Sequence, residues 1–311
     1  MRQLCAVECS IIAKEIRAFE GKRVAKVLGK KGSYFIKFGS QGIAIRIPYT
    51  VSVAETPEEK ECDNFAQRLR SILKGKKLSR VEQVSEDRII RMDFGELSLF
   101  IELFGKGNII FCKDGKIEFA TTQREYKHRK IKKGEPYIEP PKRKEVDKTG
   151  RVIAELINTG LTREYALMLM EKEGIKEEDT VEGIGAKWEK LLKMAEGLKT
   201  ATQFYAAGAE YGIGTNGERF STLSEAIERA WKSEAGAGKQ SDPEEERRKR
   251  IVEQIKARIA ELEKKIRWME ENKEEIEKAL LLFKQKKFEE LKGIGWIIDF
   301  EKRRIKKVFE D

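Results

Sequence analysis

The sequence has few of the residues that build metal and redox sites. Its four cysteines form no Cys-x-x-Cys pair, and His128 is the only histidine. Zinc sites need four such ligands at short spacings, so no zinc and no other cofactor is expected. Cys5 and Cys9 are four residues apart, and we interpret them as small buried hydrophobes rather than a reactive pair. This cysteine usage indicates a reducing compartment.

Long apolar runs are also missing. No stretch approaches the ~18 apolar residues of a membrane helix, and the start, Met-Arg-Gln-Leu-Cys, lacks the apolar segment of an export signal. The sequence therefore predicts a cytoplasmic protein without membrane contact. The phosphate-loop spacing Gly-x-x-x-x-Gly-Lys-Ser/Thr is absent as well, and no other enzyme motif stands out, so a binding protein is expected rather than an enzyme.

What the sequence has in abundance is charge. Lys and Arg number 64 against 54 Asp and Glu, which gives a net charge of +10 and a pI near 9.2. This excess favours a polyanion or an acidic membrane surface as partner, and of the two we expect nucleic acid. With 311 residues and 40% apolar content, the chain can bury a sizeable core in two or three domains.

Residues 1–148 have the pattern of an α+β domain. A helix is expected from Glu8 to Phe19, and a second from about Glu58 to Leu73, opened by Pro57. Short β-patterned runs separated by Gly-rich turns predict antiparallel meanders, and two sheet-like halves of this size predict a small β-sandwich. The predicted strands are 23–28, 34–38, 43–47, 78–84, 89–94, 97–104, 108–112 and 116–120.

After the predicted sandwich the pattern changes. Residues 123–141 are expected to leave it as a charged loop without regular strands or helices. Helical spacing then returns over 149–234, which predicts a helical domain. Within it, a small hairpin is the alternative interpretation for the Gly-rich stretch 210–220.

The last third predicts an extended arm. Residues 235–242 are expected to form a flexible linker, 243–292 one long coiled-coil helix, and 293–311 a β-like tail of two short strands. An unpaired apolar seam is compatible with a homodimer through this arm. The seam, at heptad spacing, consists of Val252, Ile255, Ile259, Leu262, Ile266, Met269, Lys273, Ile276, Leu280 and Phe283.

Asp87 and Arg88 lie where a turn meets a predicted strand. Such a pair can contact a partner, because a guanidinium group forks onto a phosphate or a base edge. From the residues alone, a surface ion pair of little energetic weight is the simpler interpretation. Arg68 and Arg70 are two residues apart on the predicted second helix, so they point to different faces, and one of them is expected to support the fold.

A basic segment follows at 124–133. It mixes cations with an aromatic residue, which is the composition of a surface that tracks phosphates and stacks on bases. A solvated basic loop is the alternative. His128 is interpreted as an RNA contact or an idle surface group, since no acid or nucleophile accompanies it. The candidate RNA-backbone contacts are Arg124, Lys127, His128, Arg129, Lys130, Lys132 and Lys133.

The most informative residues lie between Asp63 and Ile110. They are Asp63-Asn64-Phe65, Arg68-Leu69-Arg70, Gly75, Val81-Glu82-Gln83, Asp87-Arg88, Phe94-Gly95, Glu102 and Gly105-Lys106-Gly107-Asn108-Ile109-Ile110. On these residues the chain resembles the amino-terminal half of the NFACT family, whose members include bacterial RqcH and eukaryotic factors that act on stalled large ribosomal subunits.

The resemblance implies a fold and a function. The fold would be a sandwich like that of formamidopyrimidine-DNA glycosylases, then a helix-hairpin-helix-like domain, to which Gly160-Leu161-Thr162-Arg163-Glu164-Tyr165-Ala166 is similar in part, then a coiled coil. The implied function is an RNA-binding factor of ribosome-associated quality control. It would bind the large ribosomal subunit with peptidyl-tRNA and recruit aminoacyl-tRNA for carboxy-terminal tailing of stalled chains.

The resemblance also assigns residues. Asp87 and Arg88 match the family's signature for choosing tRNA, and Arg68 and Arg70 join them as candidate tRNA contacts. The family normally continues through a middle domain and a returning coiled-coil arm into a further RNA-binding domain, and we expect none of these in this sequence. We therefore expect it to perform only part of the family's activity.

Two other functions fit less of the sequence. The glycosylase likeness suggests a DNA-binding protein without lyase activity, because the chain begins Met1-Arg2-Gln3 where those enzymes carry a catalytic proline, and it has no cysteine finger. Fibronectin binding, an older label of the family, gains little support from a basic chain without an export signal.

Overall fold

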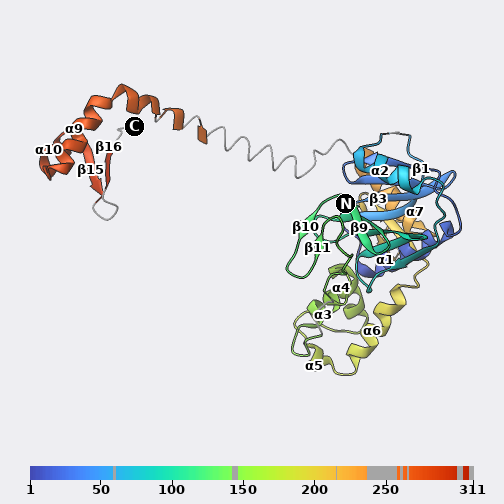
Figure 1. Cartoon of the computed structure of the whole chain (residues 1–311). Coiled ribbons are helices and arrows are strands. Elements are labelled where there is room, and N and C mark those ends of the chain that lie inside the picture. The colour runs from blue at the N-terminus through green and yellow to red at the C-terminus, as the bar shows by residue number, and fades with distance from the viewer. Residues whose placement is uncertain are drawn as a thin grey trace. The chain divides into compact units, whose positions relative to one another are not determined.

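The computed structural model describes residues 1–58, 61–141, 146–214, 216–236, 258–259, 262–264, 266–299 and 304–307 (Figure 1). The chain divides into two compact units, Met1–Gly238 and Lys239–Asp311. The predicted amino-terminal domain and the predicted helical segment both lie in the first unit. Among the described helices, none is long and apolar enough to cross a membrane.

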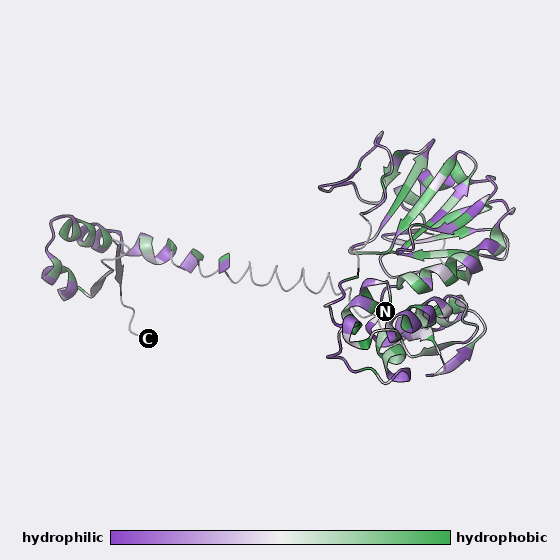
Figure 2. Ribbon diagram, turned by 90° about the horizontal axis from the view of Figure 1, so that it is seen from below, coloured by the Kyte–Doolittle hydropathy of each residue, from purple (hydrophilic) through white to green (hydrophobic). Residues whose placement is uncertain are grey.

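Two antiparallel meanders form the centre of the first unit. Their strand orders are β1-β2-β3-β4 and β5-β6-β7-β8-β9. Side chains from both sheets, such as Ile36 and Leu99, share one hydrophobic core, and Figure 2 shows how apolar their strands are. The bounds are β1 Lys26–Lys30, β2 Ser33–Lys37, β3 Gln41–Arg46, β4 Thr50–Glu55, β5 Arg80–Gln83, β6 Ile89–Phe94, β7 Leu97–Glu102, β8 Asn108–Lys113 and β9 Lys116–Ala120.

Two helices flank these sheets. Helix α1 (Ala6–Ile16) continues into a 3-10 turn (Arg17–Phe19) and buries its apolar face in the shared core. Helix α2 (Asn64–Leu73) starts later than the sequence pattern predicts. Its first turn is capped by Asp63, whose Oδ1 accepts a hydrogen bond from the Ala66 amide at 2.8 Å. An N-cap carboxylate satisfies a helix amide more directly than an upstream proline does.

The segment predicted to leave the sandwich instead folds back over it. Strands β10 (Arg124–Glu125) and β11 (Lys130–Ile131) form a short hairpin, so the expectation of an irregular loop was wrong here. Ile131 is buried against the second sheet, in a cluster apart from the main core. Tyr137 stacks on Phe100 with ring centroids 3.7 Å apart. The hairpin is thereby anchored by apolar contacts.

Helices follow, as the spacing predicts. They are α3 (Val152–Asn158), α4 (Arg163–Lys172), α5 (Val181–Ile184) and α6 (Lys187–Leu198). A three-stranded sheet of order β13-β12-β14 comes next, with bounds β12 Phe204–Ala207, β13 Glu210–Ile213 and β14 Glu218–Phe220. The stretch 210–220 thus supplies two strands, but both pair with β12 and not with each other. Helix α7 (Leu223–Gly236) reaches into the predicted linker, whose remaining residues lie outside the described ones.

In the second unit the prediction of one uninterrupted helix over 243–292 was wrong. In the described part of that range, the helical backbone is interrupted at Asn272, which precedes α9 (Lys273–Lys284). A second interruption separates α9 from α10 (Phe288–Gly293). The seam residues Val252 and Ile255 lie outside the described residues. The tail forms a hairpin of β15 (Trp296–Asp299) and β16 (Arg304–Lys307), as predicted.

The apolar seam divides between two environments. Helix α9 packs on α10 and β15 through Ala279 and Leu282, which are not seam residues, and only part of the seam, including Ile276, joins that cluster. Further seam side chains stay 44–55% exposed: Ile259, Leu262, Ile266, Met269 and Leu280.

Candidate functional site

The Asp87–Arg88 pair lies at the end of the turn between β5 and β6. Ser85 and Glu86 adopt left-handed backbone angles, with φ of 49° and 52°. The turn is held from within, because Asp87 Oδ1 accepts a hydrogen bond from the Arg88 amide at 2.7 Å. Gln83 Nε2 donates to the Asp87 carbonyl at 2.8 Å and to that of Ala6 at 2.7 Å. The pair is therefore presented on a fixed backbone.

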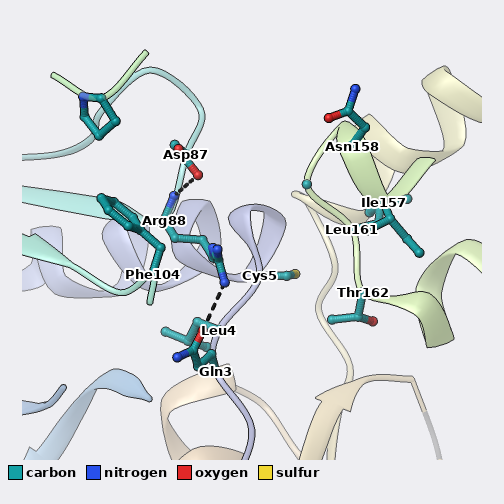
Figure 3. Close-up of a pocket in the computed structure, with 12 residues that line it drawn as sticks. Gln3, Leu4, Cys5, Asp87, Arg88, Phe104, Ile157, Asn158, Leu161 and Thr162 are labelled. Carbon is teal, nitrogen blue, oxygen red and sulfur yellow. Dashed lines mark hydrogen bonds between the residues drawn. The ribbon is translucent and has the colours of Figure 1, made fainter. Parts of the chain in front are cut away.

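The Arg88 side chain is positioned by the amino-terminal segment. Its Nη1 donates to Gln3 Oε1 at 3.1 Å (Figure 3). Gln3 Nε2 in turn donates to the Gly105 carbonyl at 3.0 Å. Gln3 thus links the guanidinium group to the β7–β8 turn. Sequence reasoning missed this residue, since nothing in the local pattern indicates that position 3 approaches position 88.

Asp87 and Arg88 line a pocket of about 590 Å³. Its opposite wall is the connection between α3 and α4, so two segments that the sequence singled out separately meet here (Figure 3). Gly160 ties that connection to α1, because its carbonyl accepts from the Ala6 amide at 3.0 Å. The walls combine charged, amide, hydroxyl and apolar groups from Gln3, Leu4, Cys5, Asp87, Arg88, Phe104, Pro140, Ile157, Asn158, Gly160, Leu161 and Thr162.

A buried charge network lies next to this pocket. Glu8 is fully buried, and its carboxylate accepts from both terminal guanidinium nitrogens of Arg2, Nη1 and Nη2. It also accepts from the Tyr165 hydroxyl at 2.6 Å and from the Cys5 amide at 2.9 Å. Burial alone would raise the pKa of Glu8, but the charge and hydrogen bonds of Arg2 outweigh it and lower the pKa. The network joins α1 to α4 and was not predicted from the sequence.

Among the residues that the structure describes, neither a metal cluster nor a reactive thiol accompanies the pocket. Over the described residues, no group of three or more His, Cys, Asp or Glu side chains is arranged to hold a metal ion. Burial raises the pKa of the Cys5 thiol well above its ordinary value, so this pocket residue stays protonated at neutral pH. The pocket presents hydrogen-bonding groups together with the Phe104 ring.

Arg68 and Arg70 are not among the residues that line this pocket. Both lie on α2 and point to different faces, as predicted. The Arg68 guanidinium carbon lies 4.2 Å from the centroid of the Phe119 ring, and Arg70 lines a shallow groove with Cys62 and Lys74. The structure therefore separates these two arginines from Asp87 and Arg88.

The basic hairpin presents most of its cations to solvent. Lys127, His128, Lys130, Lys132 and Lys133 are exposed, and Arg124 is half-buried. Glu125 pairs with Lys130 at 3.3 Å and with Lys132 at 2.7 Å, which offsets part of the positive charge. The hairpin keeps an aromatic group as well, since Tyr126 is 39% exposed.

Arg129 requires a correction. Sequence reasoning placed it among the RNA-backbone contacts, but only 6% of it is exposed. Its guanidinium group forms two hydrogen bonds with Glu102, of 2.5 and 2.9 Å, and the Tyr137 hydroxyl donates to the same carboxylate at 3.1 Å. Burial alone would lower the pKa of Arg129, yet Glu102 raises it. A phosphate cannot reach a cation that is already paired and covered, so Arg129 belongs to the scaffold.

Two solved bacterial structures share the fold of this chain. The N-terminal region of the fibronectin/fibrinogen-binding protein from Streptococcus suis aligns with a TM-score of 0.58 at 19% identity, covering 74% of this chain and 99% of that one. The fibrinogen-binding protein from Staphylococcus aureus aligns with a TM-score of 0.56 at 13% identity, covering 72% and 97%. At these identities the likeness shows a shared fold and nothing about ligands.

The family follows from the sequence itself. The NFACT N-terminal and middle domains match residues 31–306, so the chain belongs to the NFACT family, and the expectation that it lacks the middle domain was wrong. A curated relative, the archaeal Rqc2 homolog aRqcH of Methanocaldococcus jannaschii, is 36% identical over 99 residues. That match takes in 30% of this chain and 15% of the relative.

Proposed function

We propose that this chain is an RNA-binding factor of ribosome-associated quality control and that it acts in the cytoplasm by binding rather than by catalysis. It binds the large ribosomal subunit carrying peptidyl-tRNA and recruits aminoacyl-tRNA. Membership of the NFACT family and the archaeal relative's name support this assignment. We expect this chain to perform only part of the family's carboxy-terminal tailing.

One observation carries the proposal: Asp87 and Arg88 line a pocket closed on its far side by the α3–α4 connection. A guanidinium group and a carboxylate on a fixed backbone can read the donor and acceptor pattern of a base. Phe104 and Leu161 offer apolar surface for the base's face. Arg68 and Arg70 on α2 remain candidate contacts for another part of the tRNA.

The predicted coiled-coil arm, residues 243–292, provides the contact for a homodimer in this proposal. Its exposed seam residues, such as Ile266 and Met269, favour pairing with a second copy of the chain. Sedimentation at rising concentration tests this, and a chain that stays monomeric throughout contradicts it.

The proposal is tested by sequencing the RNA that the purified chain retains from a mixture of large subunits and total tRNA. The wild-type chain is expected to retain large-subunit rRNA and a few enriched tRNAs. An Asp87→Ala/Arg88→Ala variant should keep the rRNA and lose the enrichment. An excess of duplex DNA should not compete.

A matched control is available on the same sheet. The exposed Arg80 pairs with the half-buried Glu82 at 2.5 Å on β5, and Glu82 also lies 3.5 Å from Arg91, so Arg80→Ala/Glu82→Ala removes the same two charge types without touching the pocket. Its RNA profile should equal that of the wild type. The same tRNA enrichment in the Asp87→Ala/Arg88→Ala variant, or no retained RNA at all, contradicts the proposal.

A further inference from the structure

A second cationic surface shares no residue with the pocket or the basic hairpin. Residues 21–24 and 74–78 run side by side, joined by backbone hydrogen bonds. The Val24 amide donates to the Lys76 carbonyl at 2.9 Å, and the Leu78 amide donates to the Lys22 carbonyl at 2.9 Å. This pairing brings two lysine- and arginine-rich segments, more than 50 residues apart in sequence, onto one edge of the first unit.

The adjoining strands add to this edge. The Ala25 amide donates to the Lys37 carbonyl at 2.8 Å, and Lys26 lies directly opposite Lys37 in the β1–β2 pairing. Lys22 lies over the Phe19 ring, 4.8 Å from its centroid. We name the whole surface the basic ridge. It consists of Lys22, Arg23, Lys26, Lys37, Lys74, Lys76 and Lys77.

The ridge is poor in counter-charge. None of its side chains forms an ion pair with any described residue, whereas Glu125 neutralises two lysines of the basic hairpin. The nearest acid along the chain, Glu20, accepts a hydrogen bond from the Val81 amide at 2.7 Å. Like charges placed opposite each other on paired strands, as Lys26 and Lys37 are, destabilise a sheet. A cluster of this kind is stabilised when a polyanion covers it.

We infer that the basic ridge binds the phosphate backbone of RNA as a second contact beside the Asp87–Arg88 pocket. Strand β5 starts at the ridge and leads to the turn that carries Asp87. From Lys77 of the ridge to Asp87 of the pocket is ten residues, which span at most about 33 Å at ~3.3 Å per residue, so one structured RNA can touch both. The inference rests on the proposed function in one respect, namely that the polyanion is RNA.

The composition of the ridge favours RNA over an anionic membrane. Proteins that lie on a membrane surface insert apolar side chains beside their cations. Among the described residues, the exposed large apolar side chains lie elsewhere, for example at Tyr126 and Ile138. The ridge offers cations alone, which is the footprint of a phosphate-backbone contact.

The test measures how RNA affinity depends on salt. The variant Lys74→Gln/Lys76→Gln/Lys77→Gln removes three exposed charges, and the control Lys172→Gln/Lys176→Gln/Lys193→Gln removes three from the helical segment. The probes are total tRNA and vesicles containing phosphatidylserine. Binding of wild-type chain to tRNA weakens with salt in proportion to the phosphates contacted. The measured quantity is the ratio of the affinity at 50 mM salt to the affinity at 200 mM salt. Losing three phosphate contacts should make this ratio about 20- to 40-fold smaller in the ridge variant than in the wild type.

The outcomes separate this inference from the proposed function. Support requires that the ridge variant weakens tRNA binding and flattens its salt dependence, while the control does neither and the enriched tRNAs stay the same. An unchanged salt dependence in the ridge variant overturns the ridge and leaves the pocket standing. Loss of vesicle binding with intact tRNA binding also overturns it, in favour of a membrane surface. Loss of tRNA enrichment in the Asp87→Ala/Arg88→Ala variant tests the pocket alone.

Discussion

Arg88 and Arg129 were both predicted to contact RNA, and the structure gives them opposite environments. Arg88 is half-buried beside a pocket and bonds through one nitrogen to the neutral Gln3. Arg129 is buried and forms a two-point pair with the carboxylate of Glu102. The difference shows that a cation's availability to a ligand depends on where its counter-ion lies, which a basic stretch of sequence does not reveal.

The largest expected effect is a difference in the free energy of unfolding between alanine variants of these two arginines. Arg129→Ala leaves the Glu102 carboxylate buried without its partner, so we expect it to lower the free energy of unfolding by about 3–5 kcal/mol. Arg88→Ala loses one half-exposed hydrogen bond and should cost about 1 kcal/mol. Urea unfolding followed by circular dichroism measures both.

A double variant supplies the control. Arg129→Met/Glu102→Leu removes both buried charges, so it should be more stable than Arg129→Ala alone. If Arg129→Ala instead unfolds at the same urea concentration as Arg88→Ala, the distinction between scaffold and surface arginine fails.

Much of the fold was predictable because its signals are local. Strands β5–β9 are short apolar runs, most of them buried at nearly every position, and are separated by turns such as Asp114-Gly115, where both residues have positive φ. Strand β4 was missed although Val51 and Val53 are β-branched and alternate. The packing of α9 on α10 was missed because the heptad spacing indicated a different buried face.

The candidate site was predictable only in part, since it is assembled from distant segments. Asp87, Arg88 and the Gly160 connection were singled out from the sequence, but their meeting in one pocket depends on the tertiary fold. The role of Gln3 and the burial of Arg129 depend on contacts 85 and 27 residues away in sequence. The helical or strand periodicity of the sequence does not indicate contacts between residues so far apart.

A third arginine, Arg2, combines features of the other two. Its side chain is 32% exposed, yet its partner Glu8 is fully buried. Glu8→Gln removes the charge that Arg2 pairs with and disturbs the hydrogen bonds to Tyr165 and Cys5. We expect a loss of about 2–3 kcal/mol at neutral pH.

The pH dependence identifies the charge as the cause. The pKa of Glu8 is lowered in the folded protein, so its contribution is present above the ordinary glutamate value of about 4.3 and is lost as pH falls through the folded value. The difference between wild type and Glu8→Gln should therefore shrink below about pH 4. The control Glu86→Gln, at an 85% exposed side chain, should stay within about 0.5 kcal/mol of wild type. A difference that is the same at pH 7 and pH 3 contradicts a charge effect.

The smallest expected effect concerns Gln3, which positions Arg88 without being placed to read the RNA itself. Gln3→Ala should weaken binding of the enriched tRNAs about fivefold, equivalent to about 1 kcal/mol, because the freed guanidinium group must be ordered on binding. Gln3→Glu keeps an oxygen for Arg88 and should retain more of the affinity. In an Arg88→Ala background, Gln3→Ala should add nothing further, since the two residues act through one contact. An additive loss in the double variant would mean that Gln3 touches the RNA directly, and the arginine would then owe its position to the turn alone.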